Sequence, residues 1–275
     1  MNTITTLGFK WDSRVIPKAF PVHTQARVLF RFQRMLPEFV WDASVLEGNP
    51  FTFPEVKTLL DGVTVGGRKV SDHEQVLNLA ASSKALLAIV REGRFALTKP
   101  VFLQLHELVA RNEALEWGVF RGEGTEKKNS PYVALGAFDP YHPLSTVDGA
   151  PELNAVFKAA TRDLSSLCAN PAERAMLFFL FGALQQFFFD GNKRTSRFMM
   201  NGVLMSNGLD AISVPAARAE EFNTKMVNFY RHRDGTEMLQ FLVSCHPDGH
   251  HLREAEEPTN DDDGTDVTSS GFTPR

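Results

Sequence analysis

The stretch Asp190-Gly191-Asn192-Lys193-Arg194-Thr195-Ser196-Arg197 separates two apolar segments in the second half of the chain. The segments on either side of it, residues 175–189 and 198–205, are mostly apolar and are typical of buried helices. A turn that leads directly into a helix leaves the first amides of that helix free to bind an anion, and the helix dipole favours negative charge there. We therefore predict a phosphate-binding turn between two core helices.

The charged side chains of this stretch suit a nucleotide. Arg194 and Arg197 lie three residues apart, so they share one face of the predicted helix and can both reach one polyphosphate. Asp190 precedes the turn, where its carboxylate can hold a Mg²⁺ ion shared with the same polyphosphate. The sequence predicts ATP and Mg²⁺ as ligands of this turn.

The segment also resembles a known family signature. It reads Gln186-Phe187-Phe188-Phe189-Asp190-Gly191-Asn192-Lys193-Arg194-Thr195-Ser196-Arg197, and it is similar to the Fic motif, His-x-Phe-x-(Asp/Glu)-Gly-Asn-(Gly/Lys)-Arg-x-x-Arg. Every defined position matches except the first, where Gln186 replaces the catalytic histidine of the family. On this resemblance the chain is identified as a member of the Fic/Doc family, with a mainly α fold, the Fic-fold helical bundle with a small β-hairpin flap.

The resemblance implies an activity and a set of roles. Family members mostly transfer AMP from ATP to a Ser, Thr or Tyr hydroxyl of a target protein, and the histidine accepts the hydroxyl proton. It implies Mg²⁺ on Asp190, the α-phosphate on Asn192, and the other phosphates on the turn amides and the two arginines. The nucleotide-binding residues are then Gly191, Asn192, Lys193, Arg194 and Arg197.

Gln186 changes the functional expectation. A glutamine amide has no group that accepts a proton near neutral pH, and loss of a positioned base typically costs about 10²–10⁴-fold in rate. The eight histidines are read as scattered surface or core residues, not as a substitute base: His23, His73, His106, His142, His232, His246, His250 and His251.

Three functions therefore stay open. The chain is an adenylyltransferase of weakened activity, a catalytically inactive protein that binds nucleotide or target as a regulator, or a phosphoryl transferase of the Doc type. Lys193 occupies the Gly/Lys position of the motif and also occurs in the Doc branch.

A second resemblance lies far upstream. The stretch Ala43-Ser44-Val45-Leu46-Glu47-Gly48-Asn49-Pro50 is similar to the inhibitory helix of Fic proteins, which we predict at about residues 40–49. In those relatives the glutamate pairs with the second arginine of the motif, which implies a pair between Glu47 and Arg197. Such a charge-assisted pair competes with a phosphate for the same guanidinium. The alternative is that Glu47-Gly48 only ends a helix, with glycine at its C-cap.

A third resemblance concerns the flap, a hairpin that aligns the target segment in the family. We predict it from Gly118–Arg121 and Tyr132–Ala137, with Val133, Ala134, Leu135 and Gly136 as the flap residues. Exposed edge strands capture extended peptides through main-chain hydrogen bonds, so a target protein is the expected partner.

Helical patterns and caps predict the rest of the fold. The expected helices are Gln25–Val40, Pro54–Asp61, Asp72–Val90, Thr98–Ala110, Pro151–Leu167, a helix from Asn170 to about Phe187, one from the turn to Asn207, Ala216–Arg231 and Gly235–Ser244. The predicted domains are an N-terminal helical region over 1–95, the Fic core over 96–245 and a disordered acidic tail over 246–275.

Composition limits the partners. Residues 253–275 have a net charge of −5, which leaves about +1 for the rest of a chain whose total is −4, so no nucleic-acid partner is expected. No long apolar run indicates a membrane segment, and two cysteines without a motif favour a cytoplasmic location. A homodimer is possible by the resemblance. Cys245 with His246, His250 and His251 is read as the end of the fold and not as a metal site.

Overall fold

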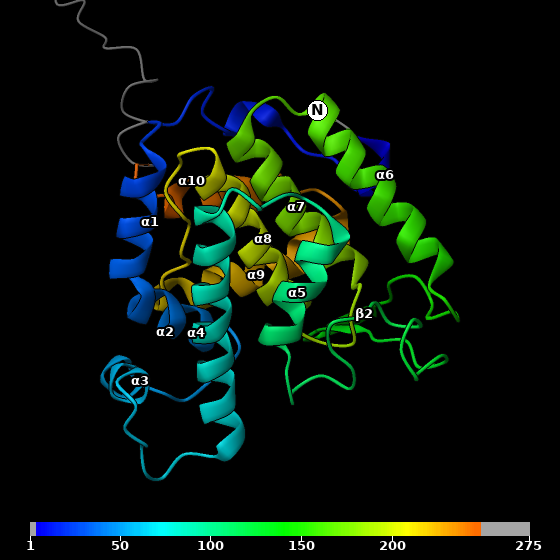
Figure 1. Ribbon diagram of the computed structural model, residues 1–275. Coiled ribbons are helices and arrows are strands. Elements are labelled where there is room, and N and C mark those ends of the chain that lie inside the picture. Colours follow the sequence, from blue (N-terminus) through cyan, green and yellow to red (C-terminus); the bar gives the residue numbers. More distant parts are fainter. Residues whose placement is uncertain (1–3, 249–275) are drawn as a thin grey trace, which may run out of the picture.

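The computed structural model describes residues 4–248, which form a mainly helical fold with one small antiparallel sheet. Figure 1 shows the arrangement. The helices are α1 Gln25–Arg34, α2 Leu36–Val45, α3 Phe53–Leu60, α4 Val70–Arg91, α5 Lys99–Val109, α6 Pro151–Leu167, α7 Pro171–Gln185, α8 Asn192–Ser206, α9 Ala219–His232 and α10 Thr236–Cys245. Three short 3₁₀ helices span Thr5–Leu7, Ser13–Val15 and Ala216–Arg218, and the strands are β1 Val133–Leu135 and β2 Phe138–Tyr141.

The helix pair α7–α8 forms the centre of the molecule, and the other helices surround it (Figure 1). Most of both helices is buried; this is expected for α7, which is mostly apolar on all sides, whereas the first two turns of α8 bury polar and charged side chains. Asn170 caps α7 by accepting hydrogen bonds from the amides of Ala172 and Glu173, and Pro171 stands in the first turn. The predicted start of this central helix is confirmed.

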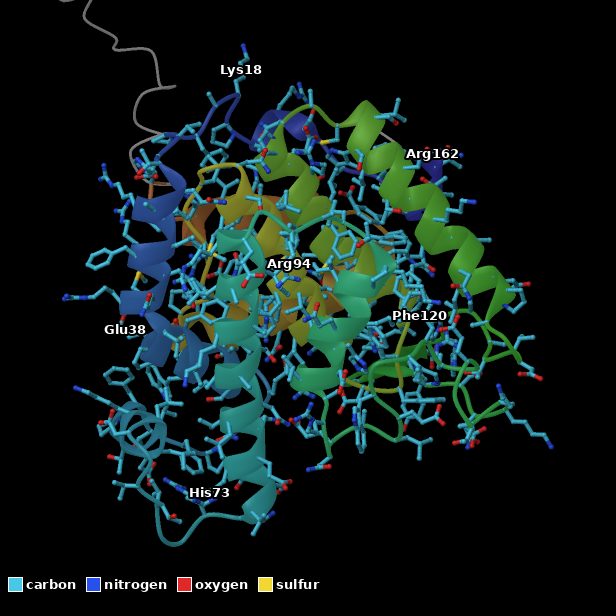
Figure 2. All side chains as sticks on the ribbon, in the orientation of Figure 1. Lys18, Glu38, His73, Arg94, Phe120 and Arg162 are labelled. Atoms are coloured by element: carbon cyan, nitrogen blue, oxygen red, sulfur yellow. The ribbon has the colours of Figure 1, made fainter. Side chains whose placement is uncertain are left out.

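Phenylalanines fill the space beside the turn that joins α7 to α8. Phe187 and Phe188 are fully buried, and the ring of Phe187 lies 4.8 Å from that of Phe120. Phe120 also contacts Phe157 of α6 at 5.5 Å, and Figure 2 labels its side chain. Each aromatic pair adds about 0.5–1.5 kcal/mol beyond its buried area. The aromatic core therefore holds the 186–191 turn against α5 and α6.

The predicted helix Gln25–Val40 is wrong as a single helix. The chain forms α1 and α2, which meet at Met35 with φ −89° and ψ 3°. Pro37 lies in the first turn of α2, because proline has no amide hydrogen and clashes with the preceding turn of a continuous helix. The break redirects the chain, and α2 then leads directly to Glu47.

The flap differs from the prediction in one strand. The β1 strand pairs with β2, with Val133 opposite Tyr141 and Leu135 opposite Phe138, so the hairpin turns at residues 136–137. Residues 118–121 take no part in this sheet; Phe120 and Arg121 are buried in the core instead. The predicted flap residues 133–136 do lie on the hairpin.

The other predicted helices are confirmed to within a few residues at each end, except that residues 216–218 form a separate 3₁₀ turn. The predicted boundary after residue 95 falls in the connection between α4 and α5. Residues 249–275 of the predicted tail lie outside the described residues. Within residues 4–248, none of the helices has both the length and the apolar composition needed to cross a lipid bilayer.

Candidate nucleotide site

Two left-handed residues shape the turn between α7 and α8. Gln186 ends α7 with φ 49°, and Gly191 stands before α8 with φ 73°. A Cβ atom on Gly191 would lie 3.2 Å from Ala110 Cβ and 3.4 Å from His106 Nε2, so the packing and the dihedral angle both require glycine. The first backbone bond of α8 runs from Thr195 to the Gly191 carbonyl. The amides of residues 192–194 thus begin the helix, as an anion site requires.

Asn192 holds the turn together with its side chain. Its Oδ1 accepts from the Phe188 amide at 2.9 Å, and its Nδ2 donates to the Phe188 carbonyl at 2.8 Å and to Gln186 Oε1 at 3.0 Å. The side chain is almost fully buried. The sequence predicted that Asn192 contacts a phosphate. Its side chain is already hydrogen-bonded to Phe188 and Gln186, so only the backbone amide of Asn192 can donate to an anion.

Gln186 lies at the end of α7 with both ends of its amide engaged. Its Nε2 donates to the Ala183 carbonyl at 2.6 Å, while its Oε1 accepts from Asn192. Tyr230 donates to the same Ala183 carbonyl at 3.0 Å, and burial raises the pKa of its phenol. Neither side chain offers an ionised base at neutral pH.

Arg121 supports the backbone at this position, and sequence reasoning did not identify that role. It is fully buried, and its Nε donates to the Gln186 carbonyl at 2.6 Å while its Nη1 donates to Thr146 at 2.9 Å. Burial lowers the pKa of Arg121 to about 10, and the group still stays charged at neutral pH. Because Thr146 follows β2, this arginine connects the flap to the motif.

Arg194 and Arg197 lie on the face of α8 that meets the Glu47 turn, as predicted. Arg197 Nη2 is 3.2 Å from Glu47 Oε1, and Arg194 Nε is 4.0 Å from Glu47 Oε2. Both arginines are almost fully buried, whereas the Glu47 side chain is 15% exposed. Arg194 Nε and Arg197 Nη1 are buried without a hydrogen-bond partner in the described part of the chain. Such unpartnered donors are costly, and an anion would satisfy them.

Charge keeps Glu47 ionised. Burial alone would raise the pKa of this carboxyl group, but the positive charges of Lys193, Arg194 and Arg197 hold it below its usual value. Burial in turn lowers the pKa of Arg197, and Glu47 partly offsets this effect. The pair is therefore a true ion pair at neutral pH.

The turn that carries Glu47 is built from the end of α2. The amide of Asn49 donates to the Ser44 carbonyl at 3.1 Å, and the amide of Gly48 donates to the Val45 carbonyl at 2.9 Å. These two bonds, with Gly48 at φ 76°, form a Schellman motif. Glu47-Gly48 therefore does end a helix with glycine at its cap, and this cap fixes Glu47 in front of Arg197.

Two further contacts anchor this turn. Asp42 accepts from Ser213 Oγ at 2.9 Å and from the Ala216 amide at 2.8 Å, which ties α2 to the segment before α9. On the other side Asn49 Nδ2 donates to Gln75 Oε1 at 3.0 Å. The inhibitory segment predicted at 40–49 is therefore packed against the core at both ends.

Sequence reasoning missed Glu113. This residue follows α5, and its Oε2 lies 2.6 Å from Arg194 Nη1. Gln75 Nε2 donates to the same oxygen at 3.1 Å, and Asn78 Nδ2 donates to the other oxygen at 3.2 Å. No local sequence pattern marks Glu113, because its partners lie on α4 and α8.

His106 is a third residue that the sequence did not reveal as part of the site. The amide of Gly118 donates to its Nδ1 at 3.1 Å, so Nε2 carries the ring proton and donates to the Asp190 carbonyl at 3.0 Å. Its ring stacks on Phe188 at 3.5 Å. Burial lowers the pKa of His106 to about 4, so the ring is neutral at pH 7. With both nitrogens engaged, His106 orients the motif turn and is no substitute base.

Asp190 lies on the exposed side of the motif turn. Asp190 is 60% exposed, and its Oδ2 is 3.5 Å from Arg194 Nη2. Its Oδ1 accepts a hydrogen bond from the Gly191 amide. A carboxylate that is exposed next to an anion site fits Mg²⁺, which keeps several waters and uses one or two carboxylates with substrate phosphates.

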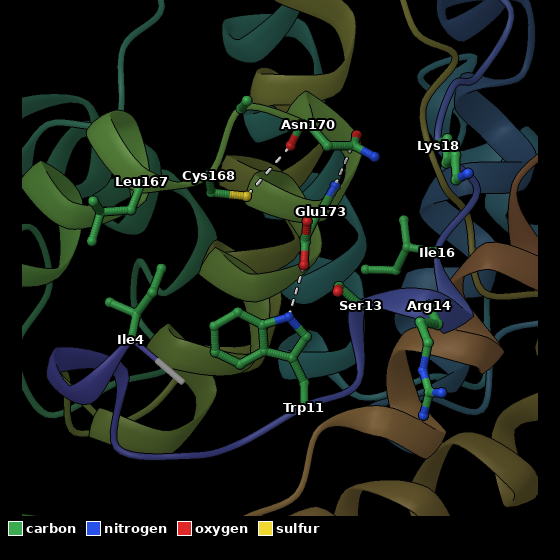
Figure 3. A pocket seen from close by; sticks show the side chains of 11 residues that line it. Ile4, Trp11, Ser13, Arg14, Ile16, Lys18, Leu167, Cys168, Asn170 and Glu173 are labelled. Carbon is green, nitrogen blue, oxygen red and sulfur yellow. Dashed lines mark hydrogen bonds between the residues drawn. The ribbon is translucent and has the colours of Figure 1, made fainter. Parts of the chain in front are cut away.

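A hollow of about 1240 Å³ lies elsewhere, between the N-terminal segment and the start of α7, and Trp11, Arg14, Lys18, Leu167 and Glu173 are among the residues that line it. Figure 3 shows the indole of Trp11 directed at Glu173, to which it donates a hydrogen bond of 2.7 Å. None of the residues that line this hollow belongs to the 186–197 motif. Size alone therefore does not identify the candidate site.

The predicted end of the fold contains a charged cluster. Cys245 Sγ accepts a hydrogen bond from Arg218, and His250 and His251 lie outside the described residues. His23 Nε2 lies 3.8 Å from Asp210 Oδ2 and 3.9 Å from Asp248 Oδ2. Arg31 Nη1 is 2.5 Å from the same Asp210 oxygen, so Asp210 already pairs with a cation.

Comparison with known proteins agrees with this geometry, although no family model matches the chain. The protein adenylyltransferase fic-1 of Caenorhabditis elegans is 23% identical over 197 residues, 69% of this chain and 36% of the relative. The protein adenylyltransferase Fic of Drosophila melanogaster is 24% identical over 213 residues, 76% of this chain and 40% of the relative. The chain thus spans about two fifths or less of the length of these relatives.

Solved structures share the fold. A Fic family protein from Desulfovibrio desulfuricans superposes with a TM-score of 0.64 at 19% identity, over 92% of this chain and 72% of that one. A Fic domain-containing signalling protein from Bacteroides thetaiotaomicron gives 0.63 at 19% identity, over 91% and 92%. With the motif turn, its arginine pair and the relatives named above, these similarities lead to one conclusion: the chain is a Fic domain protein.

Proposed function

We propose that this protein binds ATP with Mg²⁺ at the 190–197 turn and is an adenylyltransferase-like Fic protein restrained by Glu47. The observation that carries the proposal is a pair of buried donors, Arg194 Nε and Arg197 Nη1, that have no hydrogen-bond partner within residues 4–248 and lie near the start of α8. A polyphosphate would supply the missing acceptors, and bidentate arginine–phosphate contacts are among the strong charge-assisted hydrogen bonds.

In this proposal each residue of the turn has one task. The amides of Asn192 and Lys193 bind phosphate oxygens, Arg194 binds the β-phosphate and Arg197 binds the γ-phosphate. The sequence also predicted the Gly191 amide as a phosphate ligand, but this amide already donates to Asp190 Oδ1. Mg²⁺ on Asp190 neutralises part of the phosphate charge when it is bound. Glu47 occupies Arg197 and thereby excludes the γ-phosphate, which makes the closed pair an inhibitory contact.

Transfer of AMP is expected to be weak. The position of the family base holds Gln186, whose amide is bonded to Ala183 and Asn192. His106 is neutral and already has a partner on each ring nitrogen. Without a positioned base the rate falls by about 10²–10⁴-fold.

The engaged amide of Gln186 also favours a second candidate, a Fic protein that binds nucleotide or target without transfer and acts as a regulator. Phosphoryl transfer of the Doc type remains a further alternative through Lys193. In each case the partner is a target protein, docked along the free edge of the β1–β2 hairpin. A homodimer and a cytoplasmic location belong to the same proposal.

Label transfer tests the proposal. Cell lysate with ATP labelled at the α-phosphate is incubated with the Glu47→Gly protein and with the Glu47→Gly, Gln186→His protein. Labelling by the histidine variant alone supports an adenylyltransferase site that lacks its base. Labelling by both identifies an enzyme with another base. If neither protein labels a target and neither binds ATP in a direct titration, the proposed function is wrong.

A further inference from the structure

Two glutamates contact the arginine pair, and they are held very differently. Glu113 accepts hydrogen bonds from Arg194 at 2.6 Å, Gln75 at 3.1 Å and Asn78 at 3.2 Å. In the described chain Glu47 accepts one hydrogen bond, from Arg197 at 3.2 Å. A carboxylate with three good donors is a fixed part of the site, whereas one with a single longer bond can leave it at lower cost.

The contact with Glu113 also decides how Arg194 is oriented. Its Nη1 points to Glu113, its Nη2 lies 3.5 Å from Asp190 Oδ2, and its Nε has no hydrogen-bond partner within residues 4–248. Because the guanidinium is planar, fixing Nη1 fixes the direction of the other donors. The two remaining donor groups are directed away from Glu113: Nε lies 4.0 Å from Glu47 Oε2, and Nη2 lies near Asp190.

The carboxylate of Glu113 is itself held by a rigid element. Gln75 and Asn78 are one turn apart on α4, a helix of 22 residues that packs against α5 and α8. Asn78 Nδ2 also donates to the Arg111 carbonyl at 2.8 Å, which fixes the loop that carries Glu113. Gln75 in turn accepts from Asn49 at 3.0 Å. Side chains of α4 therefore fix the carboxylate of Glu113, and this carboxylate in turn fixes the guanidinium of Arg194.

We propose that Glu113 is the positioning residue for Arg194, with an effect on ATP opposite in sign to that of Glu47. Glu47 competes with the phosphates, so its removal strengthens ATP binding. Glu113 holds Arg194 in the orientation in which Arg194 binds a phosphate, so removal of Glu113 weakens ATP binding. The inference rests on the proposed nucleotide site and adds a residue to it.

The test compares ATP and AMP affinities in the Glu47→Gly protein by titration calorimetry. Glu113→Gln in this parent is expected to lower ATP affinity by about tenfold, the typical effect of losing one hydrogen bond between charged groups. AMP lacks the β-phosphate, so its affinity should change less than twofold by the same argument. Glu107→Gln is the matched control, because Glu107 is exposed on α5 and pairs only with Arg111 among the described salt bridges.

Asn78→Ala provides a second variant that keeps the carboxylate and removes one of its donors. It should lower ATP affinity in the same direction by a smaller factor, and it carries the test if Glu113→Gln does not fold. The ratio of ATP to AMP affinity is the decisive readout, because a general loss of structure would weaken both nucleotides alike.

The outcomes separate this inference from the proposed function. If the Glu47→Gly parent does not prefer ATP to AMP, the triphosphate site itself is wrong. If the parent prefers ATP but both variants behave like Glu107→Gln, the site stands and the positioning role of Glu113 is wrong. Stronger ATP binding by Glu113→Gln would make Glu113 a second competitor and would also overturn the inference.

Discussion

The carboxylate of Glu47 lies 3.2 Å from the guanidinium of Arg197, although 150 residues separate them in the sequence. Both side chains are largely buried, and the desolvation of each is offset mainly by opposite charge. Breaking such a buried pair by removing one partner leaves the other charge uncompensated. In the proposed nucleotide site, a phosphate oxygen would take the place of the glutamate as the acceptor for Arg197.

Removal of Glu47 should strengthen ATP binding. In Glu47→Gly the Arg197 guanidinium is free, and a charged hydrogen bond of about 1.5–3 kcal/mol becomes available to the γ-phosphate. We expect at least a tenfold gain in ATP affinity by titration calorimetry, by the same estimate. Glu38→Gly places the same substitution at an exposed site of α2 and should leave the affinity unchanged. Equal ATP affinities for the two variants would contradict an inhibitory role.

Arg197 should discriminate between nucleotides by their distal phosphates. In a Glu47→Gly background, Arg197→Ala is expected to lower ATP affinity by about tenfold or more and to leave AMP affinity nearly unchanged. The background removes the ion pair, so the measured loss belongs to the phosphate contact. A parallel loss for ATP and AMP would show that Arg197 acts on the fold and not on the γ-phosphate.

His106 should make stability depend on pH in a defined window. Burial depresses the pKa of its ring in the folded state from 6.5 to about 4, so between these values the unfolded chain binds more protons. Stability is therefore lost as pH falls from about 6.5 towards 4, by about 2 kcal/mol between pH 7 and pH 5.

A phenylalanine at this position keeps the stacking on Phe188 and does not titrate. Chemical denaturation at pH 7 and pH 5 gives the free energy of unfolding at each value. In His106→Phe this free energy should fall less between pH 7 and pH 5 than in the unchanged protein, even if the variant is less stable at both values. His232→Phe, at an exposed position of α9, serves as the control. The prediction fails if the two variants lose the same free energy of unfolding between pH 7 and pH 5.

Gly48 should be required for the stability of the Glu47 turn. Its φ of 76° lies in the left-handed region, where an alanine costs about 1–2 kcal/mol. No heavy atom lies within 4 Å of a Cβ built on Gly48, so the cost is conformational and not steric. Gly48→Ala should lower the midpoint of thermal unfolding by about 2–8 °C.

Gly66→Ala is the matched comparison, because its Cβ also meets nothing within 4 Å and its φ is not in the left-handed region. This variant should be neutral or slightly stabilising, since alanine reduces the entropy of the unfolded chain. Equal unfolding midpoints for Gly48→Ala and Gly66→Ala would exclude a conformational role for the left-handed cap.

Local patterns were sufficient for the elements that determine the site. Asn170 and Pro171 marked the start of α7, and the motif turn marked the start of α8, because caps and turns depend on residues close in sequence. Pro37 was also a local signal, but the apolar pattern around it predicted one continuous helix. The first strand of the hairpin was misassigned to residues 118–121. Phe120 and Arg121 of this stretch are buried in the core, and the stretch forms no part of the sheet.

Long-range partners could not be predicted in the same way. Glu47 was paired with Arg197 only through a resemblance, since no spacing rule connects residues on α2 and α8. Glu113, His106 and Arg121 have few local features, and their hydrogen-bond partners named above lie 12 to 84 residues away. A lone glutamate, histidine or arginine becomes part of a site only when packing brings its partners to it.

The sequence by itself determined the turn before α8, the central helix pair, Gln186 at the first position of the motif and the glycines at both turns. These features follow from residue type and short-range geometry. Only the tertiary structure decided which polar groups meet: Glu47 beside the two arginines, Glu113 beside Arg194, and the neutral His106 ring beside the Asp190 carbonyl. The physical reason is that an ion pair or a buried hydrogen bond depends on distances of about 3 Å, which the packing of separate helices sets.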